Sequence, residues 1–305
     1  MKQRLLLFLV MLTSISLSAQ ISIKDSTVQT IGYWNKNEKQ SYTITTDKIK
    51  LKGSDTVSKV SITCDVDVTI LDSTAKSYTI EWKYKNYRSS SKDKIRNKID
   101  AAPQDLKILI RTNEMGTFEE VINWQEVRDH MMRTSALLGK EFSNDPKFEE
   151  IMKEIEKIYT SKENIEAIAI NDIQQFYMFH GGKYTKGETA EGSIQVPNVF
   201  GGKPFDAEIM IYLEEINQED DNYVLRYEQS VDEQQLVAAV TEYIKVLAKK
   251  AGKTPPKDLG LKDMEHQTLT GSRIHDSGWV IYSILTKTVT TESTTNIEER
   301  VIEMK

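Results

Sequence analysis

Residues 60–84 read VSITCDVDVTILDSTAKSYTIEWKY and decide the fold of this chain. In the first part of this stretch apolar residues alternate with Ser, Thr and Asp; they are Val60, Ile62, Cys64, Val66, Val68 and Ile70. The turn-forming residues Asp72, Ser73 and Thr74 follow. The alternation then returns at Tyr78, Ile80, Trp82 and Tyr84. Because a period of two gives a strand one buried and one solvated face, the stretch predicts two long antiparallel strands.

Further strands are expected before and after this pair. Upstream, the apolar residues change phase between Tyr42 and Ile49, and a β-bulge near residues 46–48 would reconcile the two halves of the strand. Downstream, residues 205–213 alternate in the same way, and residues 223–227 are expected to pair back with them. The chain is expected to end in two paired strands, 279–290 and 296–303. Long antiparallel strands curl, so the sheet should be curved.

Two helices are predicted in the middle of the chain. The first begins at Asn123, and Glu126 stands at the spacing of a capping box. The second follows Asn144 or Asp145, with Pro146 in its first turn. This second helix has an apolar stripe at helical spacing, formed by Phe148, Ile151, Met152, Ile155, Ile158 and Tyr159. Such a stripe is typical of a helix that packs one face against a core.

Two more helices complete the prediction. One begins at Ser161 and ends before Gly181; its inward residues are expected to be Ile165, Ile168, Ile173 and Phe176. The other is capped by Ser230 and Glu233 and runs to about Lys250; its inward residues are expected to be Leu236, Val240, Tyr243 and Leu247. Together the elements predict an α+β fold, in which a long, curved antiparallel sheet packs on one face against about four helices.

The first nineteen residues have the pattern of a secretory signal peptide. Lys2 and Arg4 precede an apolar run at residues 5–15, and small residues lead to an expected cleavage site between Ala19 and Gln20. The apolar run is too short to span a bilayer. We therefore expect an exported chain without a transmembrane segment. Since no Pro- or Ser-rich linker divides residues 20–305, we expect them to form a single domain.

Charge and cysteine content narrow the function further. The formal net charge is −6, with the acidic residues spread along the chain. A nucleic-acid partner would need a basic stripe, so none is expected. Cys64 is the only cysteine, which excludes an intramolecular disulfide and, because it is far from the leader, a lipid anchor at the cleavage site. Its place in the alternating strand predicts a buried thiol.

Signatures of catalysis and metal binding are missing from the sequence. The four histidines include no pair at the spacing of a helical metal site, and Glu126 with His130 is a pairing expected by chance among 46 acidic residues. His180 is expected to stabilise the end of its helix. No Gly-x-Ser-x-Gly elbow and no phosphate-binding glycine loop occur. We expect no catalytic residue, no metal ion and no cofactor, and enzymatic activity stays open.

Four stretches carry a resemblance: the end of the leader, residues 71–82 (LDSTAKSYTIEW), residues 196–204 (VPNVFGGKP) and residues 276–279 (DSGW). In these the chain resembles exported proteins of unknown function common in Bacteroidota. The resemblance implies a cell envelope of the Gram-negative type, and hence a periplasmic or extracellular protein. The position of Cys64, far from the leader, predicts that it is not a lipoprotein. In architecture alone, the expected curved sheet with helices is similar to periplasmic lipid and lipoprotein carriers of the LolA type.

Two functional hypotheses follow. In the first, an apolar, lipid-like ligand binds between sheet and helices, and its candidate contacts are Trp82, Tyr84, Met131, Met152, Phe176 and Phe179. An ordinary filled core would use the same residue types. In the second hypothesis the core is filled, and the chain is an envelope protein-interaction module that binds a partner through the loop carrying Val199, Phe200 and Phe205.

Overall fold

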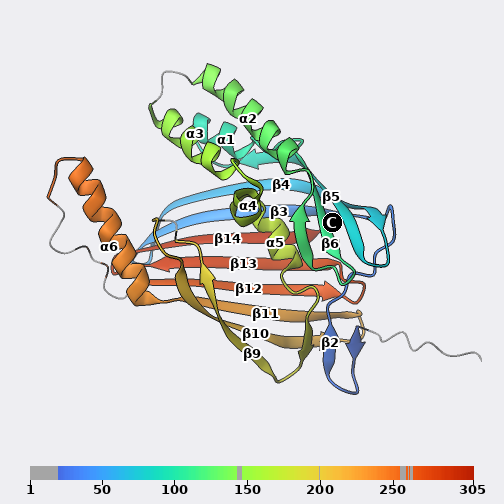
Figure 1. The fold of residues 1–305 in the computed structure, drawn as a ribbon. Helices are drawn as coiled ribbons and strands as arrows, with labels where there is room; N and C mark the ends of the chain where they lie inside the picture. Colours follow the sequence, from blue (N-terminus) through green and yellow to red (C-terminus); the bar gives the residue numbers. More distant parts are fainter. Residues whose placement is uncertain (1–19, 143–145, 199, 255–258, 260, 262–263) are drawn as a thin grey trace, which may run out of the picture.

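The dominant feature of the computed structural model is an 11-stranded antiparallel sheet (Figure 1). The structure describes residues 20–142, 146–198, 200–254, 259, 261 and 264–305. The expected signal peptide, the expected helix caps Asn144 and Asp145, and Val199 lie outside the described residues. The strand order is β7-β6-β5-β4-β3-β14-β13-β12-β11-β10-β9, so the first and last parts of the chain meet in the middle of the sheet, where β3 pairs with β14.

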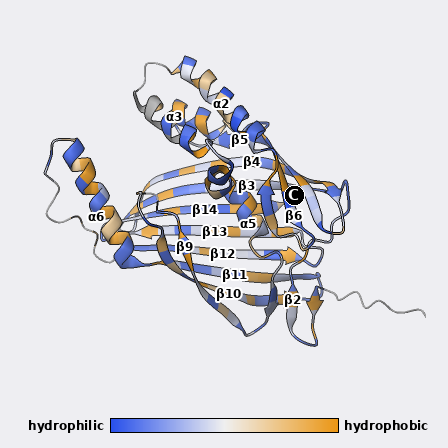
Figure 2. Ribbon diagram, viewed as in Figure 1, coloured by the Kyte–Doolittle hydropathy of each residue, from blue (hydrophilic) through white to orange (hydrophobic). Residues whose placement is uncertain are grey.

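Most strands of the main sheet are long. They are β3 (Lys39–Lys52), β4 (Asp55–Ser73), β5 (Ser77–Ser89), β6 (Lys107–Asn113), β7 (Phe118–Val121), β9 (Thr189–Val196), β10 (Phe205–Asn217), β11 (Asn222–Val231), β12 (Glu265–His275), β13 (Val280–Thr290) and β14 (Thr294–Met304). A second sheet has three short strands, β1 (Ile21–Ser22), β2 (Thr27–Gln29) and β8 (Lys183–Thr185). Figure 2 shows hydrophobic and hydrophilic residues alternating along the central strands.

The strand pair predicted from residues 60–84 is confirmed. It lies in β4 and β5, where Val68 stands opposite Trp82. The apolar residues of this pair face the same side of the sheet as Tyr42 and Ile44 of β3, because directly paired residues share a face. We call this side the inner face. Cys64 lies on it and is buried, as its place in the alternation predicts.

The helices are α1 (Lys94–Asp100), α2 (Trp124–Glu141), α3 (Pro146–Ile158), α4 (Lys162–Asn164), the π-helix η1 (Ile165–Ala169), α5 (Asn171–Tyr177) and α6 (Glu233–Lys250). Figure 1 shows α5 in front of the middle of the sheet, α6 at one end, and α1–α3 beyond β4 and β5. No helix of the described residues combines the length and apolar composition needed to cross a membrane.

The predicted fold class is wrong: the protein is sheet-dominated rather than an α+β fold with about four helices as a second layer. Helices α1, α2 and α3 share a small hydrophobic cluster of their own, which contains Leu138, Phe148 and Met152. Helix α6 covers only one end of the sheet, where Leu236 and Val240 are buried. The helices thus bury much of their apolar stripe in small clusters of their own, and they leave part of the inner face uncovered.

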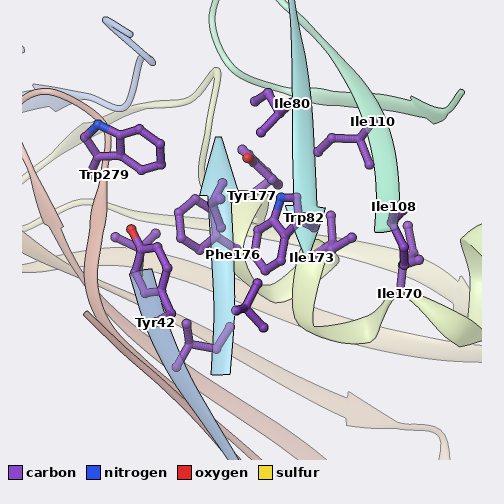
Figure 3. Packing of buried hydrophobic residues seen from close by; sticks show 14 of the residues in the cluster. Tyr42, Ile80, Trp82, Ile108, Ile110, Ile170, Ile173, Phe176, Tyr177 and Trp279 are labelled. Carbon is purple, nitrogen blue, oxygen red and sulfur yellow. The ribbon is translucent and has the colours of Figure 1, made fainter. Parts of the chain in front are cut away.

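The main core lies between the inner face and the segment from η1 to α5 (Figure 3). Phe176 of α5 makes edge-to-face contacts with Tyr42 and Trp82, with ring centroids 5.4 and 5.2 Å apart. Such pairs contribute about 1 kcal/mol each beyond the area they bury. Gln175 anchors the same helix by donating from Nε2 to Ser283 Oγ of β13 at 2.9 Å. The middle of the inner face is therefore filled.

The expected bulge at residues 46–48 is also wrong. Strand β3 pairs with β4 without interruption from Lys39 to Lys50, and the register shifts only between Lys50 and Leu51. Ile49 therefore faces the side opposite to Ile44, and Lys48 and Lys50 take the inner-face positions. The change of phase in the sequence therefore means that the apolar residues of β3 switch to the other face of the sheet. This switch occurs where the segment from η1 to α5 no longer covers the inner face.

Candidate ligand-binding site

Two hollows adjoin on the inner face. The first, of about 180 Å³, lies beside α5 and is lined by three tyrosines, Tyr84, Tyr87 and Tyr159, together with Cys64, Asp172 and Arg300. We call it the tyrosine pocket. The rest of its lining is mostly apolar, with Ile44, Ile62, Leu106, Ile108, Val127 and Ala169 among the contacts. The pocket thus has mostly apolar walls, with one carboxylate, Asp172, and one guanidinium, Arg300.

Burial keeps the thiol and the tyrosine hydroxyls of the tyrosine pocket protonated. Burial raises the pKa of the Cys64 thiol and of Tyr159 to about 12 each. The pKa of Tyr84 rises as well, first through burial and then through Asp172, whose Oδ2 accepts a hydrogen bond from the Tyr84 hydroxyl at 2.6 Å. A thiol that stays protonated at neutral pH is a poor nucleophile. The pocket is therefore suited to holding a molecule rather than attacking one.

The second hollow is larger, about 690 Å³, and lies at the ends of β4, β3, β14 and β13, next to α1. Its lining includes the apolar residues Val60, Ile95 and Val289 and the cationic residues Lys48, Lys50, Lys287 and Arg96. We call it the lysine groove. Ligand sites for small molecules typically have volumes of roughly 300–1,000 Å³ and mostly apolar walls with a few polar groups, so the groove has a suitable size.

The strand register shows that the two hollows are neighbours. Thr46, which lines the tyrosine pocket, pairs with Ile62 on one side and Arg300 on the other, and both of these line the pocket too. The next inner-face residue of β3 is Lys48, which pairs with Val60 and Glu298 of the lysine groove. The ion pair of Arg300 Nη2 with Glu298 Oε1, at 3.0 Å, joins the two hollows.

Cationic groups outnumber carboxylates in the lysine groove. Lys48 Nζ lies 3.7 Å from Glu298 Oε2, and Arg96 Nε lies 3.0 Å from Asp100 Oδ1. Within the described part of the chain, neither Lys50 nor Lys287 has an ion-pair partner. The lining contains two carboxylates, Asp93 and Glu298, and Asp93 is used to cap α1.

The predicted ligand contacts are not gathered in one place. Tyr84 lines the tyrosine pocket. Trp82, Phe176 and Phe179 are buried in the main core (Figure 3 labels the first two). Met152 belongs to the helical cluster of α1–α3, and Met131 is buried on α2.

Two of the three residues of the predicted interaction loop, Phe200 and Phe205, lie near α6, and Val199 lies outside the described residues. Phe205 is the first residue of β10 and is buried in the cluster beneath that helix. Phe200 is half-buried, and its ring centroid lies 5.4 Å from that of Tyr243 on α6.

Sequence reasoning missed the residues that line the lysine groove, including Lys48, Lys50 and Lys287. A signal for the first two was present, since the alternation of β3 changes phase where they occur. No comparable signal marks Lys287 or Arg300.

Glu126 and His130, the helical pair considered for a metal ion, each make a hydrogen bond to another group. His130 Nε2 lies 3.2 Å from the carbonyl oxygen of Ala102, while Glu126 accepts from Asn123 Nδ2 at 3.2 Å. Within the described residues, no group of three or more His, Cys, Asp and Glu side chains is placed to hold a metal ion.

Comparison with known proteins finds no matching family model and no matching curated protein. Among solved structures, lipovitellin, in a study of its lipid–protein interactions, is similar with a TM-score of 0.41 and 9% identity; the match covers 89% of this chain but 25% of that one. A putative exported protein with a YmcC-like fold from Bacteroides fragilis is similar with a TM-score of 0.24 and 8% identity, over 90% of this chain and 99% of that one. At these scores neither likeness carries an argument about the function of this chain.

Proposed function

We propose that this chain is an exported protein that binds an apolar, lipid-sized molecule along the inner face of its sheet, in the tyrosine pocket and the lysine groove. The observation that carries the proposal is that the two hollows adjoin. Together they make a track that begins beside the filled core and opens at the ends of the strands.

The length of the track suits a long acyl chain. It runs along β3 from Ile44 to Lys50, which is roughly 20 Å at a rise of about 3.3 Å per residue. The tyrosine pocket alone has room for roughly six methylene groups, if each takes about the 30 Å³ that a water molecule occupies in the liquid. Each methylene moved from water to the pocket would contribute about 0.8 kcal/mol.

The walls support an apolar occupant at the end of the track beside the filled core. Ile44, Ile62 and Leu106 line the tyrosine pocket, and Val60 continues this apolar surface into the lysine groove. We place Tyr84 among the contacts of the ligand, because its ring lines the pocket while its hydroxyl is occupied by Asp172. In this proposal Trp82 and Phe176 shape the pocket from behind, as part of the filled core.

The alternative function is an envelope interaction module, and the filled main core favours it. In that case the chain would bind a protein partner on its surface and no ligand. The loop around Phe200 is the surface we would test for it, although Phe200 is half-buried against α6.

The proposal is tested by filling the track. Val60→Trp would place a large ring in the lysine groove, whereas Val57→Trp on the same strand changes a residue that is 53% exposed. Binding of a neutral apolar dye, N-phenyl-1-naphthylamine, is measured by fluorescence. We expect the wild type and Val57→Trp to bind equally, and Val60→Trp to bind about tenfold more weakly or worse.

Circular dichroism and the melting temperature of each variant show whether it folds. Dye binding that is missing from the wild type would refute the proposal. Equal dye binding by a folded Val60→Trp variant would refute it too, because the dye would then lie elsewhere.

A further inference from the structure

We infer that the ligand is an amphipathic anion, an acyl chain that bears a carboxylate or a phosphate, and that Lys48, Lys50 and Lys287 bind its anionic group. This inference rests on the function proposed above and names the class of ligand. It follows from where the three lysines lie and from what surrounds them.

The three lysines lie close together on the inner face. Lys48 of β3 pairs with Glu298 of β14, and Glu298 pairs in turn with Lys287 of β13. Paired residues share a face, so the stems of Lys48 and Lys287 are two strand spacings apart, roughly 10 Å. Lys50 is the next inner-face residue along β3, roughly 7 Å from Lys48. Long lysine side chains can span these distances, so the three ammonium groups can converge on one anionic group.

The protein compensates this cluster of positive charge only in part. Glu298 is shared, since its carboxylate oxygens lie 3.7 Å from Lys48 Nζ and 3.0 Å from Arg300 Nη2. No ion pair of Lys50 or Lys287 exists among the described residues. The chain as a whole has a net charge of −6, so a groove lined by an excess of cations departs from its overall balance. An anion is the ligand whose charge complements it.

The order of the two hollows sets the orientation of the ligand. The lysines stand at the strand ends, and the apolar wall of Ile44 and Ile62 lies farther in. The tail would therefore enter the tyrosine pocket and the anionic group would stay at the lysine groove. The reverse orientation would bring the anion toward the Asp172 carboxylate, which repels it. The one cation of that pocket, Arg300, is already paired with Glu298 at 3.0 Å, whereas Lys50 and Lys287 form no ion pair within the described part of the chain.

The experiment compares ligands that differ only in charge. A long-chain fatty acid and its methyl ester are used to displace N-phenyl-1-naphthylamine from the wild-type protein. The acid should compete about tenfold better than the ester, and the difference should shrink at high salt because screening weakens the contribution of the lysines. A lysophosphatidic acid with the same chain, tested in parallel, distinguishes a phosphate group from a carboxylate.

Charge-reversal variants locate the effect. Lys50→Glu/Lys287→Glu should lose about tenfold in affinity for the acid while its affinity for the ester is unchanged. The matched control is Lys24→Glu/Lys76→Glu, which changes the net charge equally at two exposed turns. The control should behave as the wild type does.

The outcomes separate the two proposals. If the dye binds but acid and ester compete equally, or if the folded groove variant still prefers the acid as the wild type does, the anionic ligand is refuted and the apolar ligand stands. If the wild type binds no dye, the proposed function is refuted, and the anionic ligand with it.

Discussion

At the scale of single residues, His180 shows how burial sets protonation. It follows α5, and its Nε2 lies 2.8 Å from the carbonyl oxygen of Gly278, an arrangement in which Nε2 carries the proton and donates it. Its ring stacks on Phe176 and lies beside Trp34. Burial lowers its pKa from 6.5 to about 4, so the imidazole is neutral in the folded protein. The helix-end role expected for a charged His180 therefore does not apply.

This lowered pKa predicts how stability depends on pH. The folded state resists protonation of His180, while the unfolded state accepts a proton below about pH 6.5. The contribution of the neutral His180 to the free energy of unfolding is therefore complete above pH 6.5 and is lost as the pH falls to about 4. This contribution amounts to about 3 kcal/mol. In His180→Gln this loss should be missing. Urea unfolding of the wild type and of His180→Gln at several pH values between 7.5 and 4.5 measures the free energy of unfolding of each. If the two free energies fall in parallel as the pH is lowered, the prediction is contradicted.

The sequence predicted which residues point inward better than it predicted which of them border a cavity. Cys64 and Trp82 are buried on the inner face, as their alternation indicates. A filled core and the wall of a pocket use the same residue types, however, so Trp82 and Tyr84 could not be told apart. What separates them is the position of α5, and this depends on contacts far apart in the sequence.

At the scale of elements, β4 is held to its neighbours on the outer face by Asp67. Its carboxylate accepts hydrogen bonds from Lys39 Nζ at 2.9 Å, Lys85 Nζ at 2.7 Å and Ser41 Oγ at 2.8 Å. These groups come from β3 and β5, so one carboxylate links three strands. Although its burial acts in the opposite direction, these hydrogen bonds lower the pKa of Asp67 and keep it ionised.

We predict that Asp67→Asn destabilises the protein by about 2 kcal/mol, because two ammonium groups lose a charged acceptor. The control is Asp72→Asn on the same strand. Asp72 contacts Lys36 with both side chains more than half exposed, and such pairs are worth less than about 1 kcal/mol. Chemical unfolding of both variants gives the two values. If Asp67→Asn and Asp72→Asn lower the free energy of unfolding equally, Asp67 does not link the strands.

Strand β12 was missed because it lacks the apolar alternation on which prediction depends. Strand β12 places Thr268, Thr270 and Ser272 on the inner face, and all three are buried. A strand whose buried face is polar shows no apolar alternation. The hydroxyl of Ser272 joins a buried hydrogen-bond network instead, since Ser272 Oγ lies 2.8 Å from Ser283 Oγ, which accepts from Gln175 Nε2.

The sequence predicted the positions of the helices more accurately than their capping residues and their buried faces. Helix α2 begins where Asn123 indicates, but the Asn123 side chain accepts from Leu109 N at 2.8 Å and so ties the helix to β6. The predicted helix after Ser161 is divided by η1, and Ile168 is exposed. Asp232 caps α6 in place of Ser230.

Two residues of α6 that were expected to face inward, Tyr243 and Leu247, are exposed. Leu236 and Val240, by contrast, are buried. The apolar stripe predicts an inward face along the whole helix. The structure covers only its first half, because the helix extends past the end of the sheet (Figure 1).

At the scale of the whole molecule, the feature that matters for function is the incomplete cover of the sheet. The α+β prediction assumed that each amphipathic helix buries its stripe on the sheet, but α1–α3 satisfy much of theirs among themselves. Hydrophobic periodicity shows that a helix has an apolar face and not what that face meets. The uncovered strand ends, with Lys48, Lys50 and Lys287, form the lysine groove as a result.

The central claim, that a lipid-sized molecule occupies the track on the inner face, is tested most directly by native mass spectrometry. The chain from Gln20 onward, expressed with export to a periplasm and purified without detergent, is compared with its Val60→Trp and Val57→Trp variants. We predict a reproducible added mass of lipid size on the wild type and on Val57→Trp, and its loss from Val60→Trp. A wild type with no added mass that also takes up no lipid supplied to it, or an equal added mass on the folded Val60→Trp variant, would contradict the claim.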